Sequence, residues 1–98
     1  MSASVDPKLA NAILQGKARD GKVHAAFTLR GVKGEVLTPE KTDALVKEMV
    51  GKASSLTNKM ADKLVVFKNL QSFSIEAPAD LVEKLADEDA IGTAALGS

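Results

Sequence analysis

Cysteine, tryptophan and tyrosine are absent from the sequence, and its 98 residues include only three phenylalanines. The absence of cysteine excludes disulfides, thiol nucleophiles, iron–sulfur clusters and the usual cysteine-based zinc sites. It does not indicate a compartment, because a chain without thiols tolerates both oxidising and reducing surroundings. With so few aromatic side chains, the hydrophobic core has to consist mainly of Leu, Val, Ile, Ala and Met.

Neither sign of charge is in excess, because 13 basic and 13 acidic residues cancel. A chain without a basic surplus lacks the electrostatic attraction that drives nucleic-acid binding, so we expect no nucleic-acid partner. No apolar run approaches the length of a membrane span. The N-terminus has neither the basic start nor the apolar segment of a secretory signal. We therefore expect a soluble, cytoplasmic protein with no membrane partner.

The composition is typical of one globular domain. Hydrophobic residues make up 45% of the chain and charged residues 27%, which is the range of folded rather than disordered proteins. A chain of 98 residues has room for a single hydrophobic core.

The first 21 residues differ in pattern from the rest. Asp6 followed by Pro7 is typical of a helix start, with the acid as N-cap and proline at the first helical position. Apolar residues then recur at helical spacing, at Leu9, Ala10, Ile13 and Leu14. Gly16 and the turn signal Asp20-Gly21 predict the end of this helix. We expect an N-terminal helical extension over residues 1–21 and a domain over residues 22–98.

Beyond residue 21 the sequence predicts six elements. An alternating strand over residues 22–29 is followed by a helix that starts at Thr38-Pro39. Next come two strands joined by a short turn, a second helix and a last strand, over residues 63–68, 72–76, 78–88 and 91–96. This order is the split βαβ, or ferredoxin-like, arrangement. We predict an α+β fold with a four-stranded antiparallel sheet, two helices on one face, and a short N-terminal helix.

Alternation within two strands predicts which side chains are buried. Val23, Ala25, Phe27 and Leu29 alternate with more polar positions, and Phe73, Ile75 and Ala77 do the same. This pattern fits a sheet that helices cover on one face and leave open on the other. The run Leu64-Val65-Val66-Phe67 is apolar at every position, which is typical of a central strand.

No catalytic or metal-binding motif is present. His24 is the only histidine and falls on the polar side of its strand, without a sequence neighbour that would orient it as a base. No serine lies in a nucleophile-elbow context. The acidic residues Asp87, Glu88 and Asp89 do not follow the spacing of a calcium loop, and are expected to form a solvated face or a contact for a basic partner. We predict a non-enzyme without cofactor or metal.

One segment carries a resemblance to a known family. Residues 65–78, followed by residues 81–86 and 89–91, look like the subtilisin-propeptide family of proteinase inhibitors. The shared pattern is a strand, a tight turn, a strand that ends in a small residue, and a short helix with a leucine stripe, followed by an apolar residue. The positions that match are Phe73, Ile75, Ala77, Leu81, Leu85 and Ile91.

The resemblance implies a non-catalytic inhibitor, or chaperone-like binder, of a subtilisin-like serine protease. In that family the open sheet face packs on the protease, and the segment after the last strand lies in the substrate cleft. Carried over to this chain, the cleft-binding tail is Thr93, Ala94, Ala95 and Leu96. The contacting turn is Asn69, Leu70 and Gln71. The contacting sheet face is His24, Thr28, Ser72, Ser74 and Glu76.

The alternative is a structural or regulatory ferredoxin-like module. Such a domain self-associates, or binds another protein, through its sheet. For either function we expect a monomer or a weak dimer. The sequence does not identify the target protease, the affinity for it, or the role of the N-terminal helix.

Overall fold

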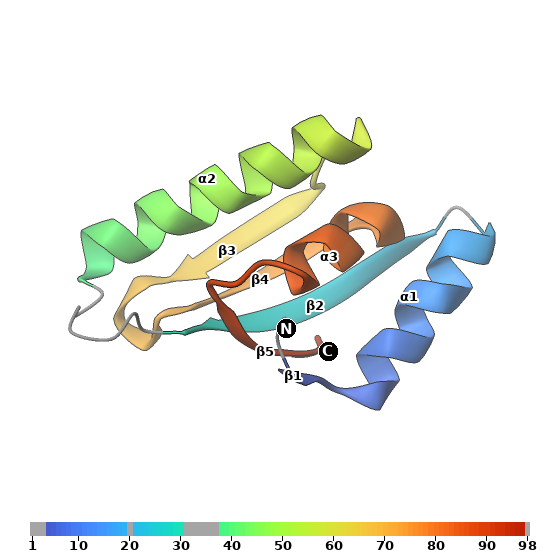
Figure 1. Ribbon diagram of the computed structural model, residues 1–98, viewed down its shortest axis with the longest axis horizontal. Helices are drawn as coiled ribbons and strands as arrows, with labels where there is room; N and C mark the ends of the chain where they lie inside the picture. The colour runs from blue at the N-terminus through green and yellow to red at the C-terminus, as the bar shows by residue number, and fades with distance from the viewer. Residues whose placement is uncertain (1–3, 20, 31–37, 98) are drawn as a thin grey trace.

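The computed structural model describes residues 4–19, 21–30 and 38–97. Its elements follow the chain in the order drawn in Figure 1. They are β1 (Ser4–Val5), α1 (Pro7–Arg19), β2 (Lys22–Leu29), α2 (Pro39–Thr57), β3 (Lys63–Phe67), the 3-10 turn η1 (Lys68–Leu70), β4 (Ser72–Pro78), α3 (Ala79–Ala86) and β5 (Ile91–Leu96).

The strands form one sheet in the order β1-β5-β2-β4-β3. Strand β2 pairs antiparallel with β4 on one side and with β5 on the other, and β3 pairs antiparallel with β4. These four strands have the predicted ferredoxin-like arrangement, which confirms the fold class. A fifth strand, β1, was not predicted: its two residues pair parallel with β5. A strand of two residues is too short to show a periodic pattern in the sequence.

Strand β3 is an edge strand, so its prediction as a central strand is wrong. Among the described residues it pairs with β4 alone. Leu64 and Val66 point toward the helices and pack against the core, whereas Val65 and Phe67 are exposed on the other face. The continuous apolar run therefore does not mean that β3 is buried on both faces: one face packs on the core, and the other is an exposed apolar surface.

The described helices all lie on one side of the sheet. Helix α3 sits in the middle and contacts both α1 and α2 (Figure 1). Beneath it, Phe27 of β2 and Phe73 of β4 stack with ring centroids 5.0 Å apart. Offset aromatic stacking of this kind adds about 0.5–1.5 kcal/mol to the burial of the rings. Leu9 and Ile13 of α1 belong to the same buried cluster, so the N-terminal helix shares the core of residues 22–98.

The helix starts follow the caps read from the sequence. Thr38 Oγ1 accepts a hydrogen bond from the Lys41 backbone N–H at 3.2 Å, and proline occupies the first turn of α2. Asp6 Oδ1 accepts from the Lys8 backbone N–H at 3.2 Å at the start of α1. Of the two end signals read for α1, Gly16 does not end the helix, which runs to Arg19, immediately before the Asp20-Gly21 signal in the sequence. Gly16 lies close to α3 and β2: a Cβ there would come 2.9 Å from Ala79 Cβ.

Candidate functional site

One face of the sheet is not covered by any described helix, and we call it the open face. Side chains alternate along a strand, so residues between the buried positions of β2 and β4 point to this face. Strand register places residues of β3 and β5 beside them. The open face consists of His24, Ala26, Thr28, Lys63, Val65, Phe67, Ser72, Ser74, Glu76, Thr93 and Ala95.

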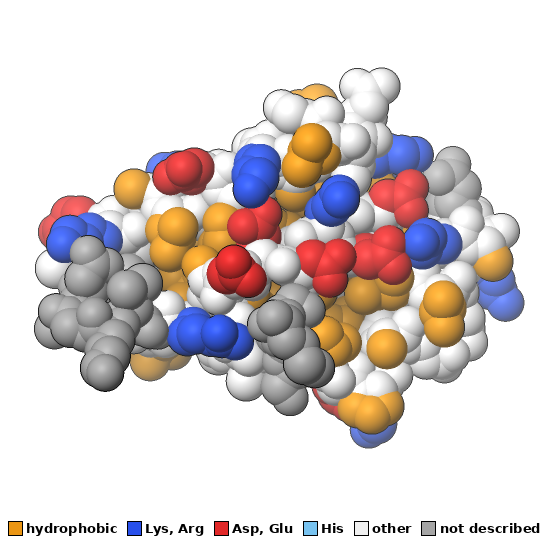
Figure 2. Space-filling view, viewed as in Figure 1, with side chains coloured by type: hydrophobic (Ala, Val, Ile, Leu, Met, Phe, Trp, Pro, Cys, Tyr) orange, Lys and Arg blue, Asp and Glu red, His pale blue; other side chains and the backbone are white. Residues whose placement is uncertain are grey.

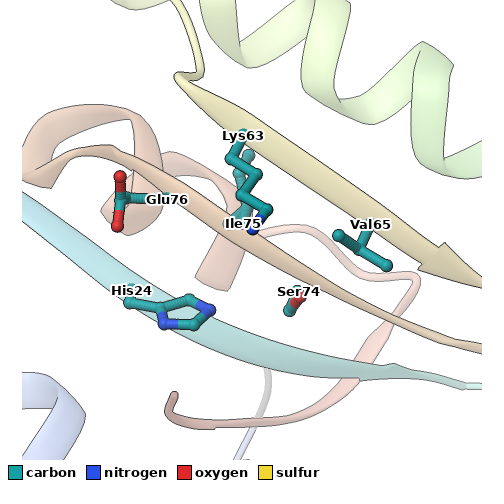
Figure 3. A pocket seen from close by; sticks show the side chains of 6 residues that line it. All are labelled: His24, Lys63, Val65, Ser74, Ile75 and Glu76. Atoms are coloured by element: carbon teal, nitrogen blue, oxygen red, sulfur yellow. The ribbon is translucent and has the colours of Figure 1, made fainter. Parts of the chain in front are cut away.

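Strand register arranges the open face in three rows that run across the strands. The first row is charged, because Glu76 of β4 lies directly between His24 of β2 and Lys63 of β3. Figure 3 shows these side chains together with Ser74 and Val65, which belong to the next row. The register places the Glu76 carboxylate opposite the Lys63 ammonium, and opposite charges on neighbouring strands are a favourable cross-strand pair.

The other two rows are apolar or carry hydroxyls. The second row runs Ala95, Ala26, Ser74 and Val65 from β5 to β3. The third row runs Thr93, Thr28, Ser72 and Phe67 in the same direction. The hydroxyls of Thr28 and Thr93 hydrogen-bond to each other across β2 and β5. Val65 is 36% and Phe67 43% exposed, so the apolar end of the face lies along β3.

A hollow lies on the charged end of the open face. It has a volume of about 150 Å³ and is lined by His24, Lys63, Val65, Ser74, Ile75 and Glu76 (Figure 3). Pockets that hold drug-sized molecules measure roughly 300–1,000 Å³. The hollow is therefore too small for such a ligand, but it has the size to accept a single side chain that protrudes from a protein partner.

His24 is held in place by the chain that follows β5. The backbone N–H of Gly97 donates to the His24 carbonyl at 2.8 Å, and a Cβ at Gly97 would come 2.9 Å from the imidazole ring. The ring therefore has backbone against it on one side. In residues 4–19, 21–30 and 38–97 no hydrogen bond or ion pair joins His24 to a carboxylate, so the orienting partner of a histidine base is absent from this part of the chain.

The residues predicted to form the cleft-binding tail are part of the sheet rather than a free segment. Thr93, Ala94, Ala95 and Leu96 lie within β5, where Thr93 to Leu96 pair with β2. Thr93 and Ala94 also pair with β1 on the other side, and Ala94 is buried. Removing these residues from the sheet would break main-chain pairing on both sides. A segment that enters a protease cleft has to come after Leu96.

The remaining predicted contacts fall in two places. The five predicted sheet residues, His24, Thr28, Ser72, Ser74 and Glu76, all lie on the open face. Asn69, Leu70 and Gln71 form the turn at the end of β3, where Leu70 is 73% exposed and Gln71 has a left-handed backbone with φ of 51°. This turn adjoins the third row through Ser72.

The prediction from the sequence missed four of the eleven residues of the open face. It did not include Lys63, Val65 and Phe67, because β3 was taken for a central strand, nor Ala26. The signal that could have identified β3 as an edge strand is the lysine at each end of its apolar run, Lys63 and Lys68. Lysines at the ends of a strand are common at the edges of natural sheets.

The helix-covered side has a different character. Figure 2 shows acidic side chains gathered over α3 on this side. Two of them form ion pairs between elements: Lys17 of α1 with Glu83 at 2.9 Å, and Lys52 of α2 with Glu88 at 3.5 Å. Glu83 raises the pKa of Lys17 through a hydrogen bond and its charge. Part of the acidic cluster is thus used within the molecule, and the predicted contact with a basic partner stays a prediction.

Comparisons with known proteins gave no relative. No protein-family model matches this sequence, and neither the curated proteins nor the solved structures compared with it contain a match. In the part of the chain that the structure describes, no three or more His, Asp or Glu side chains are grouped so as to bind a metal ion. The described helices include none with the length and apolarity needed to span a membrane.

Proposed function

We propose that this domain is a non-catalytic binder of a subtilisin-like serine protease and that it docks through the open face. The observation that carries this proposal is a sheet face that no described helix covers, on which Val65 and Phe67 remain exposed. Hydroxyl and charged side chains of β4 and β2 lie beside them in a fixed register. Exposed apolar side chains next to polar ones are the usual composition of a protein–protein interface.

The class of target comes from the resemblance to the subtilisin-propeptide family. Its six matching positions, Phe73, Ile75, Ala77, Leu81, Leu85 and Ile91, are all buried. They account for the ferredoxin-like fold rather than for contacts with a protease. The resemblance therefore supports the protease as partner only through the arrangement that the fold produces, which is a sheet packed on helices with its other face free.

The size of the open face limits what docking alone can achieve. With strands about 4.8 Å apart and residues about 3.4 Å apart, the area over β5, β2, β4 and β3 is roughly 20 by 20 Å, or about 400 Å² in projection. A standard protein–protein interface buries about 800 Å² on each partner. The face therefore provides about half of a standard interface, and tight binding requires a second contact.

That second contact can be the chain after β5. Gly97 leaves the sheet beside His24, at the charged end of the open face. Two residues of this sequence, Gly97 and Ser98, follow β5, and an enzyme's substrate cleft that reaches this point can form hydrogen bonds with their main chain, which is a common mode of peptide recognition. Docking by the face and occupation of the cleft are then separable parts of one interaction.

The test measures the two parts separately. Inhibition is measured as residual activity of a panel of serine proteases with the domain in stoichiometric excess. Docking is measured as binding to the same proteases after their active-site serine has been blocked. Ala26→Arg places a long charged side chain in the middle of the open face, and Ala44→Arg makes the same change at an exposed position of α2 on the other side.

We expect at least one subtilisin-like protease to bind the domain, and A26R to weaken that binding more than tenfold. A44R should bind like the unchanged domain, and both variants should keep its far-UV circular dichroism spectrum. Equal binding by A26R and A44R would exclude the open face as the docking surface. Absence of binding and of inhibition across all subtilisin-like members of the panel would exclude the proposed target class.

A further inference from the structure

The outer edge of β3 carries main-chain groups that no described strand pairs. The Glu76 carbonyl accepts a hydrogen bond from the Asp62 N–H at 2.8 Å, so Glu76 turns its main-chain groups toward β3. Because these groups alternate in direction along a strand, the residues of β3 opposite Glu76 and Ser74, namely Lys63 and Val65, turn theirs toward β4. Leu64 and Val66 therefore present their N–H and C=O groups to the open edge.

The same assignment follows independently from β2. The His24 carbonyl accepts from Gly97, so His24 faces β5, and the Leu29 N–H donates to the Gln71 carbonyl, so Leu29 faces β4. Alternation from these two residues again leaves Ser74 and Glu76 facing β3. Hydrogen bonds of β4 and of β2 thus lead to the same result: the N–H and C=O groups of Leu64 and Val66 point away from β4.

Two of the devices that protect sheet edges are missing from β3. Its register with β4 is regular, without a bulge, and no proline interrupts it. Lysines are confined to its ends, at Lys63 and Lys68, and leave residues 64–67 apolar. Exposed apolar side chains are concentrated here: of the seven large exposed hydrophobic residues in the described part of the chain, four lie between residues 60 and 70. They are Met60, Val65, Phe67 and Leu70.

The segment is complementary to itself when two copies run antiparallel about a two-fold axis at Val65. In this register Leu64 of each copy faces Val66 of the other, which are the two residues with free main-chain groups. Beyond them, Lys63 faces Phe67, which are the first and last residues of β3. A lysine over an aromatic ring is an attractive cross-strand pair.

We propose that β3 pairs with β3 of a second copy of this chain and joins the two five-stranded sheets into one. The four hydrogen bonds between Leu64 and Val66 of the two copies form the centre of the contact. The two-fold axis stands perpendicular to the sheet, so both open faces lie on one side and both helix layers on the other. Because a five-residue edge buries little surface, this is a weak, concentration-dependent dimer. The contact shares Lys63, Val65 and Phe67 with the open face, but it needs no protease, so self-association of the chain tests it independently of the proposed docking.

The natural absence of cysteine allows a clean crosslinking test of the register. In this pairing Val65 faces Val65 as a non-hydrogen-bonded pair, whose Cα atoms are about 4.5 Å apart in an antiparallel sheet. This is within the range of about 4.4–6.8 Å that a disulfide spans. V65C should form a disulfide dimer under mild oxidation. K63C and F67C should each remain monomeric alone and crosslink when mixed, because Lys63 faces Phe67.

Charge variants test the same axis without a covalent bond. In sedimentation velocity runs from micromolar to millimolar protein, the unchanged chain should show a rising dimer fraction. V65K and V65E should each stay monomeric, because like charges meet on the axis, and an equal mixture of the two should recover the dimer. Because Val65 is exposed in the single chain, we expect neither substitution to lower the stability of the folded monomer much.

A26C and the pair A26K and A26E are the matched controls on the open face. Preferential crosslinking of A26C, or recovery of a dimer only in the A26K and A26E mixture, would show face-to-face association and overturn the edge pairing. A chain that stays monomeric at the highest concentration, with V65C no faster to crosslink than A26C, would overturn it as well.

Discussion

Two glycine-to-alanine substitutions in helices should have opposite effects on stability. Gly16 lies in α1 and Gly51 in α2, and both are within the helix rather than at its ends. Replacing a helical glycine by alanine gains about 1 kcal/mol when nothing else changes, because alanine loses less backbone entropy on folding. The surroundings of the new methyl group decide whether that gain survives.

At Gly51 the new methyl group meets nothing within 4 Å, so G51A should stabilise the fold by about 0.5–1 kcal/mol. At Gly16 it would come 2.9 Å from Ala79 Cβ and 3.1 Å from Val23 Cγ2. Both neighbours are buried, and neither is the end of a flexible side chain. Overpacking of this kind costs about 1–3 kcal/mol. Subtracting the propensity gain leaves G16A destabilised by up to about 2 kcal/mol.

The assay is urea unfolding followed by far-UV circular dichroism, since the chain has no tryptophan to report by fluorescence. The midpoint should rise for G51A and fall for G16A, with the slope of the transition unchanged for both. In a thermal scan, 1 kcal/mol corresponds to about 4–8 °C for a domain of this size. If G16A stabilises the protein as much as G51A does, the close packing of α1 on α3 and β2 is incorrect.

Three further predictions concern helix ends and one ion pair. T38A should lower the free energy of unfolding by about 1 kcal/mol, because the hydrogen bond from the Lys41 N–H to the cap is lost. T38S keeps the hydroxyl and should retain most of the stability, and the urea midpoints of the two variants measure the difference. Asn58 ends α2 with φ of 56°, so N58G should unfold at a higher urea concentration than the unchanged chain and N58A at a lower one. The raised pKa of Lys17 means that its pair with Glu83 stabilises the fold fully below pH 10.5 and loses this effect as pH rises through the folded-state value. The difference in unfolding midpoint between K17Q and the unchanged chain should therefore be constant from pH 6 to 9 and shrink above pH 10.5; a difference that grows with pH would contradict this assignment.

Strands with clear alternation and helices with clear caps could be predicted from the sequence. The alternation of Val23 to Leu29 and of Phe73 to Ala77 identified the buried face correctly. Thr38 and Asp6 marked the starts of α2 and α1 because their side chains accept hydrogen bonds from the first helical turn. These are local effects, which a single sequence records directly.

What escaped prediction depends on tertiary contacts. Gly16 was read as one of two helix-end signals, yet α1 runs through it, and the lack of a Cβ there leaves room for Ala79 of α3. The apolar run of β3 gives no sign that the side chains on one of its faces, Val65 and Phe67, stay exposed. Thr93 was assigned to a free tail by the resemblance, whereas its hydroxyl bonds to Thr28 within the sheet. On the open face, the sequence therefore identified His24 and the hydroxyl residues of β2 and β4, but not the three residues of β3, which are Lys63, Val65 and Phe67.

Nuclear magnetic resonance can locate the surface on which a protein partner binds, residue by residue. The backbone amide signals of the ¹⁵N-labelled domain are followed while a serine-blocked subtilisin-like protease is added. We expect the largest changes at Ala26, Ser74 and Val65 and in the neighbouring rows, with α2 unaffected. Changes centred on α2 and α3, with the rows of the open face unmoved, would contradict this expectation.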